Sequence, residues 1–468
     1  MVFSSVAFLF YFLPVFLFVY YALPRVRNLT LLLGSLIFYA WGEWDFLPLM
    51  VASICANYLM ALQIDRSTRR RLMLASGIVL NLGVLCIFKY LVFIDQNLGA
   101  VFHVSIPGAY HFTRIPLGIS FFTFQSISYL VDVYRRNTDA EKNPLNVGTY
   151  IAMFPQLVAG PIVRFKTVRD ELHHRTTPLH QVATGAHIFI LGLSSKLLIA
   201  DTLAFPADAA FTMGTTSLST SLAWLGVISY TFQIYFDFAG YSAMAIGLGL
   251  MLGFHFPQNF NHPYVAQSVT DFWRRWHISL STWFRDYLYI PMGGNRGGWL
   301  RTSRNLIVVF VLCGLWHGAS WNFLLWGVYH GVFLVLERML KGRITVRFRP
   351  LRHLYLVSTV AFGWVLFRGI NLTHVGHVAR RLFSAVEEPM VRGAGEYMGP
   401  HIWIILVLAS LLCAFGEKLA PYYFQLIRRR EGPAALLALR TTCGLLLLFL
   451  CFGSLAANTH SPFIYFNF

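Results

Sequence analysis

Residues 314–327 read GLWHGASWNFLLWG and lie inside a long apolar stretch, residues 305–339. A membrane-spanning helix needs about 20 mostly apolar residues. This stretch is therefore long for one span, and it predicts two half-helices that are separated by a break near Gly314–Ala319. The only ionisable side chain in the quoted segment belongs to His317. Because an ionisable group at membrane depth is costly, His317 is a candidate functional residue.

The composition of the whole chain is typical of a polytopic membrane protein. Of its 468 residues, 56% are hydrophobic and 12% are charged, whereas soluble domains carry about a quarter charged residues. The chain is also rich in Phe, Tyr and Trp, which suits aromatic belts at the membrane interfaces. We expect an all-α fold with a single membrane domain over residues 1–468. The candidate spans are 5–23, 28–44, 46–62, 72–93, 117–133, 184–204, 219–235, 238–254, 305–339, 353–369, 401–419 and 435–456.

The basic residues behind the net charge of +17 lie in short loops between these spans. Basic loops tend to stay in the cytoplasm, so their order places the N-terminus outside. The first apolar run has no positively charged leader and no small-residue cleavage site after it, which predicts a retained first span rather than a cleaved signal peptide. No basic helix or aromatic–basic platform favours nucleic-acid binding. The residues that set this topology are Arg25 and Arg27, then Glu43 and Asp45, then Arg66 and Arg69–Arg71, and near the end Arg428–Arg430.

Cysteine and metal-ligand patterns indicate no redox or metal chemistry. The six cysteines all lie in apolar runs and form no CxxC pair, so we interpret them as small buried hydrophobic side chains. The sequence contains no HExxH motif and no carboxylate-rich cluster. We therefore predict no metal site.

A second histidine lies in the segment FWRRWHISLSTWF, residues 272–284. If this segment is helical, Trp273, His277, Ser281 and Phe284 share one face. Arg274 would then lie near the edge of that face and hold the imidazole neutral, as a base must start. The alternative is an interfacial aromatic helix whose histidine only forms hydrogen bonds.

For His317, two interpretations also stay open. Gly314 and Gly318 remove bulk beside the imidazole and would let a substrate approach, while Trp316 and Trp321 would wall the site. A neutral histidine there could take a proton from a hydroxyl that attacks an acyl carbonyl. Alternatively, it is a core histidine bonded to a backbone carbonyl.

Three further patterns near these motifs have their own alternatives. His317 and His330 have a spacing that haem-binding membrane proteins use, but no matching pair occurs on another span. Cys313 lies four residues before His317, where a thiol could meet an imidazole, although a packing cysteine is the simpler interpretation. Asp237 is either an ion or proton site of a transporter or a structural partner of a basic residue.

Five long segments resemble the membrane-bound O-acyltransferase family. They occur in the family's order between residues 1 and about 370. Within the family, the resemblance is nearest to the branch that acts in alginate and bacterial cellulose acetylation. The segments are PLGISFFTFQSISYLVDVYR (116–135), FPQLVAGPIVRF (154–165), YTFQIYFDFAGYSAMAIGLGLMLGFHFPQNFNHPY (230–264), FWRRWHISLSTWFRDYLYIPMGGNR (272–296) and GLWHGASWNFLLWGVYHG (314–331).

The resemblance implies a fold and a pair of catalytic residues. The fold is a ring of about 11–12 tilted transmembrane helices, with re-entrant or half-helices around a central tunnel, in which residues 1–370 form the core and 371–468 the closing helices. His317 of the GLWHG motif is the essential histidine and His277 of the RRWHxSLS motif the second. Neighbouring residues in the two motifs are expected to line the tunnel, namely Trp276, Ser281, Arg285, Asp286, Trp316, Trp321 and Asn322.

The resemblance also implies the reaction and its setting, the bacterial inner membrane. Acetyl groups pass from a cytoplasmic donor, acetyl-CoA, to an exported polysaccharide, alginate or cellulose, by way of a periplasmic SGNH-type acetyltransferase and a polysaccharide synthesis and export complex. No bound cofactor is expected, and membrane lipids surround the chain. His317 is the general base or becomes acylated, and His277 orients an acyl or acceptor group. Arg164, Lys166 and Arg169 either attract the coenzyme A phosphates or are only positive-inside residues.

The rival hypothesis is a membrane transporter that uses Asp237 and Lys196 in a substrate path, or a non-catalytic subunit of a polysaccharide export complex. The two intact histidine motifs favour the enzyme. The segment 374–400 is amphipathic in part, so it either lies on the membrane surface, docks a partner or forms a simple loop.

Overall fold

The computed structural model describes residues 1–214, 217–340, 348–384, 393–428 and 434–457. Every regular element in these ranges is a helix, so the all-α prediction is confirmed. The chain divides into two compact units, residues 1–189 with 244–257 and residues 190–243 with 258–468. The prediction of a single membrane domain stays a prediction, and each unit is described by itself.

Unit 1 is built around α6, in which all residues but the last are buried. This helix packs against α3, α4, α7 and α9, and its Tyr129 meets the rings of Tyr150 and Phe165. The helices of unit 1 are η1 (Ala7–Phe12), α1 (Leu13–Ala22), η2 (Pro24–Val26), α2 (Arg27–Glu43), η3 (Trp44–Phe46), α3 (Leu47–Arg66), α4 (Arg70–Leu85), η4 (Cys86–Tyr90), α5 (Leu91–Phe102), η5 (Ala109–Phe112), α6 (Ile119–Tyr134), α7 (Pro144–Ala152), α8 (Phe154–Leu157), α9 (Phe165–His173) and the first part of α10 (Leu179–Ser194).

Unit 2 contains both histidine motifs. Short helices α13 and α14 carry the first motif, and the contact between α15 and α16 carries the second. Its elements are η6 (Ser195–Ala200), α11 (Asp201–Thr212), most of α12 (Thr220–Met251), η7 (Pro263–Val265), α13 (Val269–Arg275), α14 (Ile278–Phe284), η8 (Arg285–Tyr289), α15 (Gly298–His317), α16 (Trp321–Leu340), α17 (Arg349–Arg368), α18 (Leu372–Phe383), η9 (Ala394–Tyr397), α19 (Pro400–Arg428) and α20 (Ala434–Ala456).

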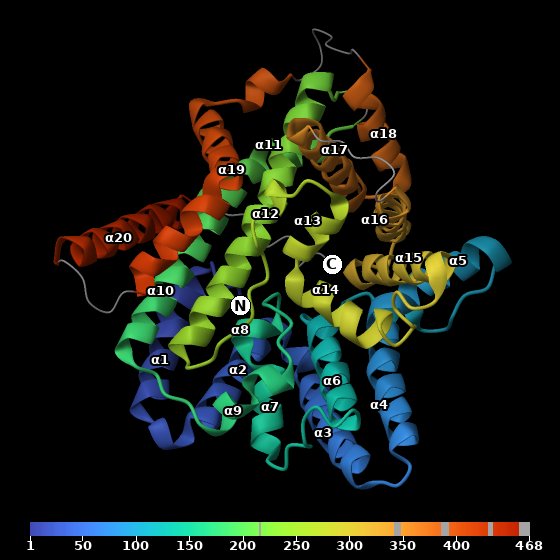
Figure 1. The fold of residues 1–468 in the computed structure, drawn as a ribbon, viewed down its shortest axis with the longest axis vertical. Coiled ribbons are helices and arrows are strands. Elements are labelled where there is room, and N and C mark those ends of the chain that lie inside the picture. The colour runs from blue at the N-terminus through green and yellow to red at the C-terminus, as the bar shows by residue number, and fades with distance from the viewer. Residues whose placement is uncertain (215–216, 341–347, 385–392, 429–433, 458–468) are drawn as a thin grey trace. The chain divides into compact units, whose positions relative to one another are not determined.

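Nine helical runs within the described ranges are long and apolar enough to cross a membrane. The predicted spans 219–235 and 238–254 are wrong as two helices, because α12 is one continuous helix of 32 residues (Figure 1). The predicted break inside 305–339 is confirmed at residues 318–320. However, α15 and α16 are helices of 20 residues each rather than half-helices.

Glycines let α15 and α16 pack so closely that their backbones are in contact. A Cβ built on Gly314 would lie 2.1 Å from the carbonyl oxygen of Phe323, and one on Gly327 would lie 2.2 Å from that of Phe310. The prediction that Gly314 and Gly318 open space for a substrate is therefore wrong, since a Cβ on Gly318 would also meet the ring of Phe323 at 2.2 Å. These glycines serve helix packing.

We expect Gly314→Ala to lower the free energy of unfolding by about 1–3 kcal/mol or more, because a carbonyl oxygen of a packed helix cannot move aside as a flexible side chain would. The measurement is thermal unfolding of the purified protein in detergent. Gly376→Ala in α18 is the matched control. A Cβ there meets nothing within 4 Å, and alanine is the better helix former. Equal melting temperatures for the two variants would contradict this account of the helix contact.

Two smaller predictions need correction. Cys313, Cys413 and Cys451 are buried as expected, but Cys55, Cys86 and Cys443 are exposed on the surface of the described chain. Within 374–400, residues up to Phe383 belong to α18 rather than to a loop. Residues 385–392, together with Arg429 and Arg430 of the predicted basic loop, lie outside the described residues.

Candidate active site in unit 2

The first histidine motif is not one helix. α13 ends at Arg275, Trp276 is extended, and His277 adopts a left-handed backbone conformation with φ 43° and ψ 55° before α14 begins. The predicted common face of Trp273, His277, Ser281 and Phe284 is therefore wrong. Left-handed backbone in a residue with a Cβ costs about 1–2 kcal/mol, so surrounding contacts must hold His277 in place.

Those contacts come from the segment that follows α12. The N–H of Ile278 donates to the carbonyl of Asn259, and the N–H of Asn261 donates to the carbonyl of Arg275, so the two chain segments run side by side. The Nδ1 atom of His277 lies 3.1 Å from Oδ1 of Asn259. His277 is 1% exposed, as is Asn259. Sequence reasoning had missed Asn259, which lies 18 residues before the histidine that it contacts.

Burial lowers the pKa of His277 to about 3 from its ordinary 6.5. The imidazole is thus neutral at physiological pH, as a base must start. The predicted reason is wrong, however: Arg274 is exposed, and the cause is loss of water around the ring rather than a nearby cation.

The lowered pKa of His277 predicts acid sensitivity. Between pH 6.5 and pH 3 the unfolded chain binds a proton at His277 that the folded chain does not, so stability falls as the pH falls. We expect a loss of up to about 1.4 kcal/mol per pH unit from this group. Melting temperatures measured across this range should fall less steeply for His277→Gln than for wild type. His353→Gln, at an exposed position, is the control, and equal slopes for wild type and His277→Gln would contradict the prediction.

A second buried cluster surrounds His317, the last residue of α15. Its imidazole is 3% exposed and packs edge-on against Trp326 and Phe367, with ring centroids 5.1 and 5.2 Å away. The ring of Trp316 contacts both histidine rings, with centroids 4.9 Å from His317 and 6.0 Å from His277. The fold thus brings the two motif histidines, 40 residues apart in sequence, to the same indole.

The remaining predicted tunnel residues take different positions. Trp276 is buried against Phe272 and Trp364, and Trp316 is buried as described, whereas Trp321 is 53% exposed and begins α16. The prediction that Trp321 walls the histidine site is therefore not supported by its placement.

The polar side chains of the two motifs form hydrogen bonds with backbone carbonyl groups or an ion pair with a neighbouring side chain. Asn322 is buried and donates from Nδ2 to the carbonyl of Gly369 at 2.6 Å. The hydroxyl of Ser281 donates to the carbonyl of Trp276 at 3.4 Å. Arg285, with 59% of its side chain exposed, pairs with Asp286 at 2.7 Å. These contacts hold the ends of α14, α16 and α17, and any contact with a substrate stays a prediction.

His330 and Asp237 have structural partners. His330 is fully buried, accepts a hydrogen bond at 3.4 Å from the indole N–H of Trp273, and packs on the same Trp326 as His317. The Nζ atom of Lys196 lies 2.6 Å from Asp201 and 2.9 Å from Asp237, and all three side chains are at most 2% exposed. The interpretation of Asp237 as the partner of a basic residue is confirmed, and the transporter hypothesis loses its main support.

A carboxylate that sequence reasoning missed holds the start of α13. Glu337 of α16 accepts the backbone N–H groups of Val269 and Thr270, at 2.5 and 2.8 Å, and the hydroxyl of Thr270 at 2.6 Å. A negative charge at a helix N-terminus is stabilised by the helix dipole. This contact fixes α13 against α16, and so fixes the first motif relative to the second within unit 2.

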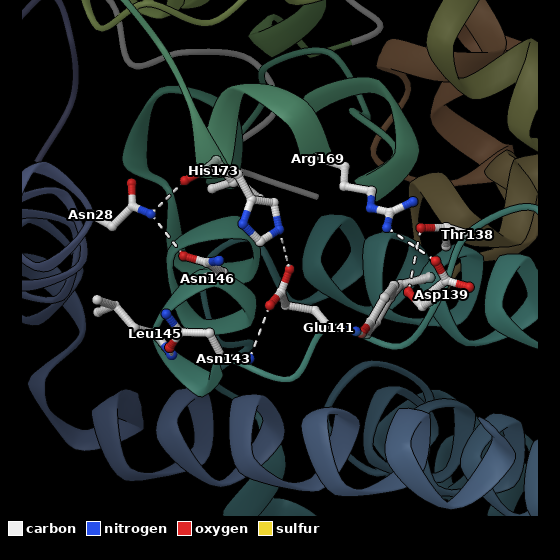
Figure 2. Close-up of polar contacts among 11 residues, drawn as sticks. Asn28, Thr138, Asp139, Glu141, Asn143, Leu145, Asn146, Arg169 and His173 are labelled. Carbon is white, nitrogen blue, oxygen red and sulfur yellow. Dashed lines mark hydrogen bonds and ion pairs between the residues drawn. The ribbon is translucent and has the colours of Figure 1, made fainter. Parts of the chain in front are cut away.

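The basic residues proposed to meet coenzyme A lie in unit 1. Lys166 is 3.5 Å from the buried carboxylate of Asp132. Arg169 pairs with Asp139 at 3.1 Å, and the neighbouring His173 lies 2.7 Å from Glu141 (Figure 2). Because Lys166 and Arg169 already have acidic partners, their charges are partly neutralised, which favours a structural role over phosphate binding.

Comparisons with known proteins agree with this architecture. The model of the family described as "MBOAT, membrane-bound O-acyltransferase family" matches residues 66–377. The "Probable alginate O-acetylase" of Azotobacter vinelandii is 42% identical, with all of both chains covered. The protein of the same name from Pseudomonas aeruginosa is 45% identical over 93% of this chain and 85% of its own. The "Peptidoglycan O-acetyltransferase" of Helicobacter pylori is 34% identical over 100% of this chain and 98% of its own.

The matched region contains both histidine motifs and the helices that position them. Together with the apolar helices long enough to span a bilayer, these similarities show a multi-pass membrane O-acyltransferase. The chain belongs to the membrane-bound O-acyltransferase family.

Proposed function

We propose that the chain transfers acetyl groups from acetyl-CoA in the cytoplasm across the bacterial inner membrane, for O-acetylation of an exported polysaccharide. The observation that carries this proposal is full-length similarity to proteins named for O-acetylation of alginate and of peptidoglycan. The polymer we favour is alginate, because several of the similar proteins are named for it, and cellulose is the second choice.

The chemistry is acyl transfer between a thioester and a hydroxyl. The hydroxyl oxygen forms a bond to the acetyl carbon, the carbon–sulfur bond breaks, and the hydroxyl proton passes by way of a base to the departing thiolate. His317 is our choice of base. It lies at the carboxyl end of α15, where the partial negative charge of the helix stabilises a positive imidazole. Trp316, Trp326 and Phe367 shield the reaction from water.

His277 is the second catalytic group in this proposal. It stays neutral because it is buried, and it shares the indole of Trp316 with His317. A covalent acetyl-histidine at His317, in place of proton abstraction, is compatible with the same residues. The acetyl group passes to a periplasmic acetyltransferase partner and the polymer synthesis complex, and the N-terminus lies in the periplasm, as the alternation of basic and acidic loops indicates.

The test is the O-acetyl content of exported polysaccharides from cells with and without this gene. Loss of acetyl esters from one polymer, restored by the wild-type gene, would support the proposal and identify the acceptor as alginate, cellulose or peptidoglycan. Unchanged acetylation of all three polymers would contradict it. Release of free thiol from acetyl-CoA by inside-out membrane vesicles tests the donor separately, since a different donor would leave acetyl-CoA intact.

A further inference from the structure

The side chain of Asn259 is the centre of a buried hydrogen-bond network around His277. Its Oδ1 atom accepts the backbone N–H of Ser279 at 3.2 Å and the hydroxyl of the same residue at 2.8 Å. Its Nδ2 atom donates to the hydroxyl oxygen of Ser242 in α12 at 3.0 Å. Ser242, Asn259 and Ser279 are at most 5% exposed, so water does not compete for these bonds.

The main chain fixes which end of this amide faces His277. A backbone N–H can only donate, so the atom that it meets on Asn259 must be the carbonyl oxygen. The amide nitrogen then faces Ser242, whose hydroxyl can accept. The orientation of the amide therefore follows from a fixed donor rather than from an arbitrary assignment.

The same oxygen determines the tautomer of His277. Oδ1 of Asn259 cannot donate, so the Nδ1 atom 3.1 Å away must carry the hydrogen. A neutral imidazole has one N–H, which leaves the lone pair on Nε2. Nε2 is buried, and within the described part of the chain no hydrogen-bond donor or acceptor meets it.

We propose that Asn259 is a positioning residue that holds His277 with Nε2 as a hydrogen-bond acceptor, so that His277 receives the O–H of the acceptor hydroxyl rather than donating to the acetyl carbonyl. The tautomer of His277 follows from the hydrogen bonds alone. The acceptor hydroxyl as its partner rests on the proposed function. Of the two partners left open for His277, acyl group or acceptor, a lone pair suits the acceptor, because it attracts a hydroxyl hydrogen and repels a carbonyl oxygen.

Packing and acidity agree with this role. The ring of Phe238 meets the imidazole edge-on with centroids 4.7 Å apart, and Trp316 contacts it as well, so packing restricts rotation of the imidazole ring. Burial lowers the pKa of His277 to about 3. His277 therefore orients the hydroxyl without keeping its proton, which leaves proton removal to His317.

The tautomer is tested without any activity measurement. Full-length protein with isotope-labelled imidazole nitrogens is studied in detergent by NMR, and the signals of His277 are assigned by difference from His277→Gln. We expect an N–H shift at Nδ1 and a lone-pair shift at Nε2. Asn259→Asp, which keeps an oxygen acceptor, should preserve this pattern, and Asn259→Ala should lose it. The opposite tautomer in wild type would overturn the inference.

The functional part is tested by thiol release from acetyl-CoA in inside-out membrane vesicles from cells that also make the periplasmic partner and the polymer. We expect Asn259→Ala to lower kcat about 100-fold, the cost of misplacing a reacting group, and to leave KM for acetyl-CoA unchanged. Asn259→Asp should recover most of this loss, and Asn261→Ala, an exposed neighbour, is the matched control. If Asn259→Ala does not fold, the kcat of Asn259→Asp and the imidazole nitrogen shifts of the wild-type protein test the inference instead.

These results separate the inference from the proposed function. A folded Asn259→Ala with wild-type kcat would overturn the positioning role and leave the acyltransferase mechanism standing. Full activity of His277→Ala would remove the substrate assignment of His277 even if the NMR pattern is as expected. For Asn259→Ala, a rise in KM for acetyl-CoA as large as the expected fall in kcat would also overturn the inference, because it would place His277 at the donor.

Discussion

Replacing His317 by alanine is expected to lower acetyl transfer about a thousandfold, within the range that a positioned general base contributes. The imidazole is the only basic group of the quoted motif. It is buried among Trp316, Trp326 and Phe367, where few water molecules can replace it. If an acetyl-histidine forms instead, the loss should be at least as large, because the nucleophile itself is gone.

The measurement is acetyl ester content of the exported polymer in cells that express each variant, normalised to the amount of protein in the membrane. His317→Gln accompanies His317→Ala, since glutamine fills the same space and forms hydrogen bonds but cannot take up a proton. His353→Ala in α17, at an exposed position, is the matched control. Wild-type acetylation by either His317 variant at normal abundance would show that this histidine is a packing residue.

Replacing Lys196 by methionine is expected to destabilise the protein by about 3–5 kcal/mol, because it leaves two buried carboxylates without the ammonium group that they share. Asp201 and Asp237 lie 2.6 and 2.9 Å from Nζ, and the three side chains are almost fully buried. The close approach of α12 to the end of α10 also requires Gly240, because a Cβ there would lie 2.7 Å from the carbonyl oxygen of Gly192. The ion cluster thus joins η6, α11 and α12 within unit 2.

Thermal unfolding in detergent measures this loss, together with the abundance of the protein in membranes. The matched control is the triple variant Lys196→Met, Asp201→Asn, Asp237→Asn, which removes all three charges. Replacing a whole buried ion cluster by neutral groups is often tolerated, whereas removing one partner is not. Stability should therefore recover in the triple variant. An unchanged melting temperature for Lys196→Met alone would show that the cluster contributes little.

The neighbouring positions of α12 explain why one helix serves both stability and the candidate site. Asp237 belongs to the ion cluster, Phe238 packs on His277, and Ser242 accepts the hydrogen bond from Asn259. A disturbance of the ion cluster should therefore also reduce activity in the protein that remains folded. Measuring kcat per folded molecule in Lys196→Met would show this coupling.

Features that depend on nearby residues could be predicted from the sequence. Span length and hydropathy are local properties, and they predicted an all-α membrane protein and a break near Gly314–Ala319, which the structure places at residues 318–320. The same reasoning failed where a local pattern had two explanations. The glycines beside His317 were interpreted as space for a substrate, but they face the backbone of a neighbouring helix.

By itself, the sequence determined the class of the protein, its family and the two histidines most worth testing, because long motifs with fixed spacing are specific. Only the tertiary structure decided how these residues are arranged. The kink at His277, the tautomer set by Asn259 and the sharing of Trp316 by two histidines all arise from contacts between residues far apart in the chain. Periodicity describes the neighbours along one helix, whereas burial and hydrogen bonding depend on which segments the fold brings together.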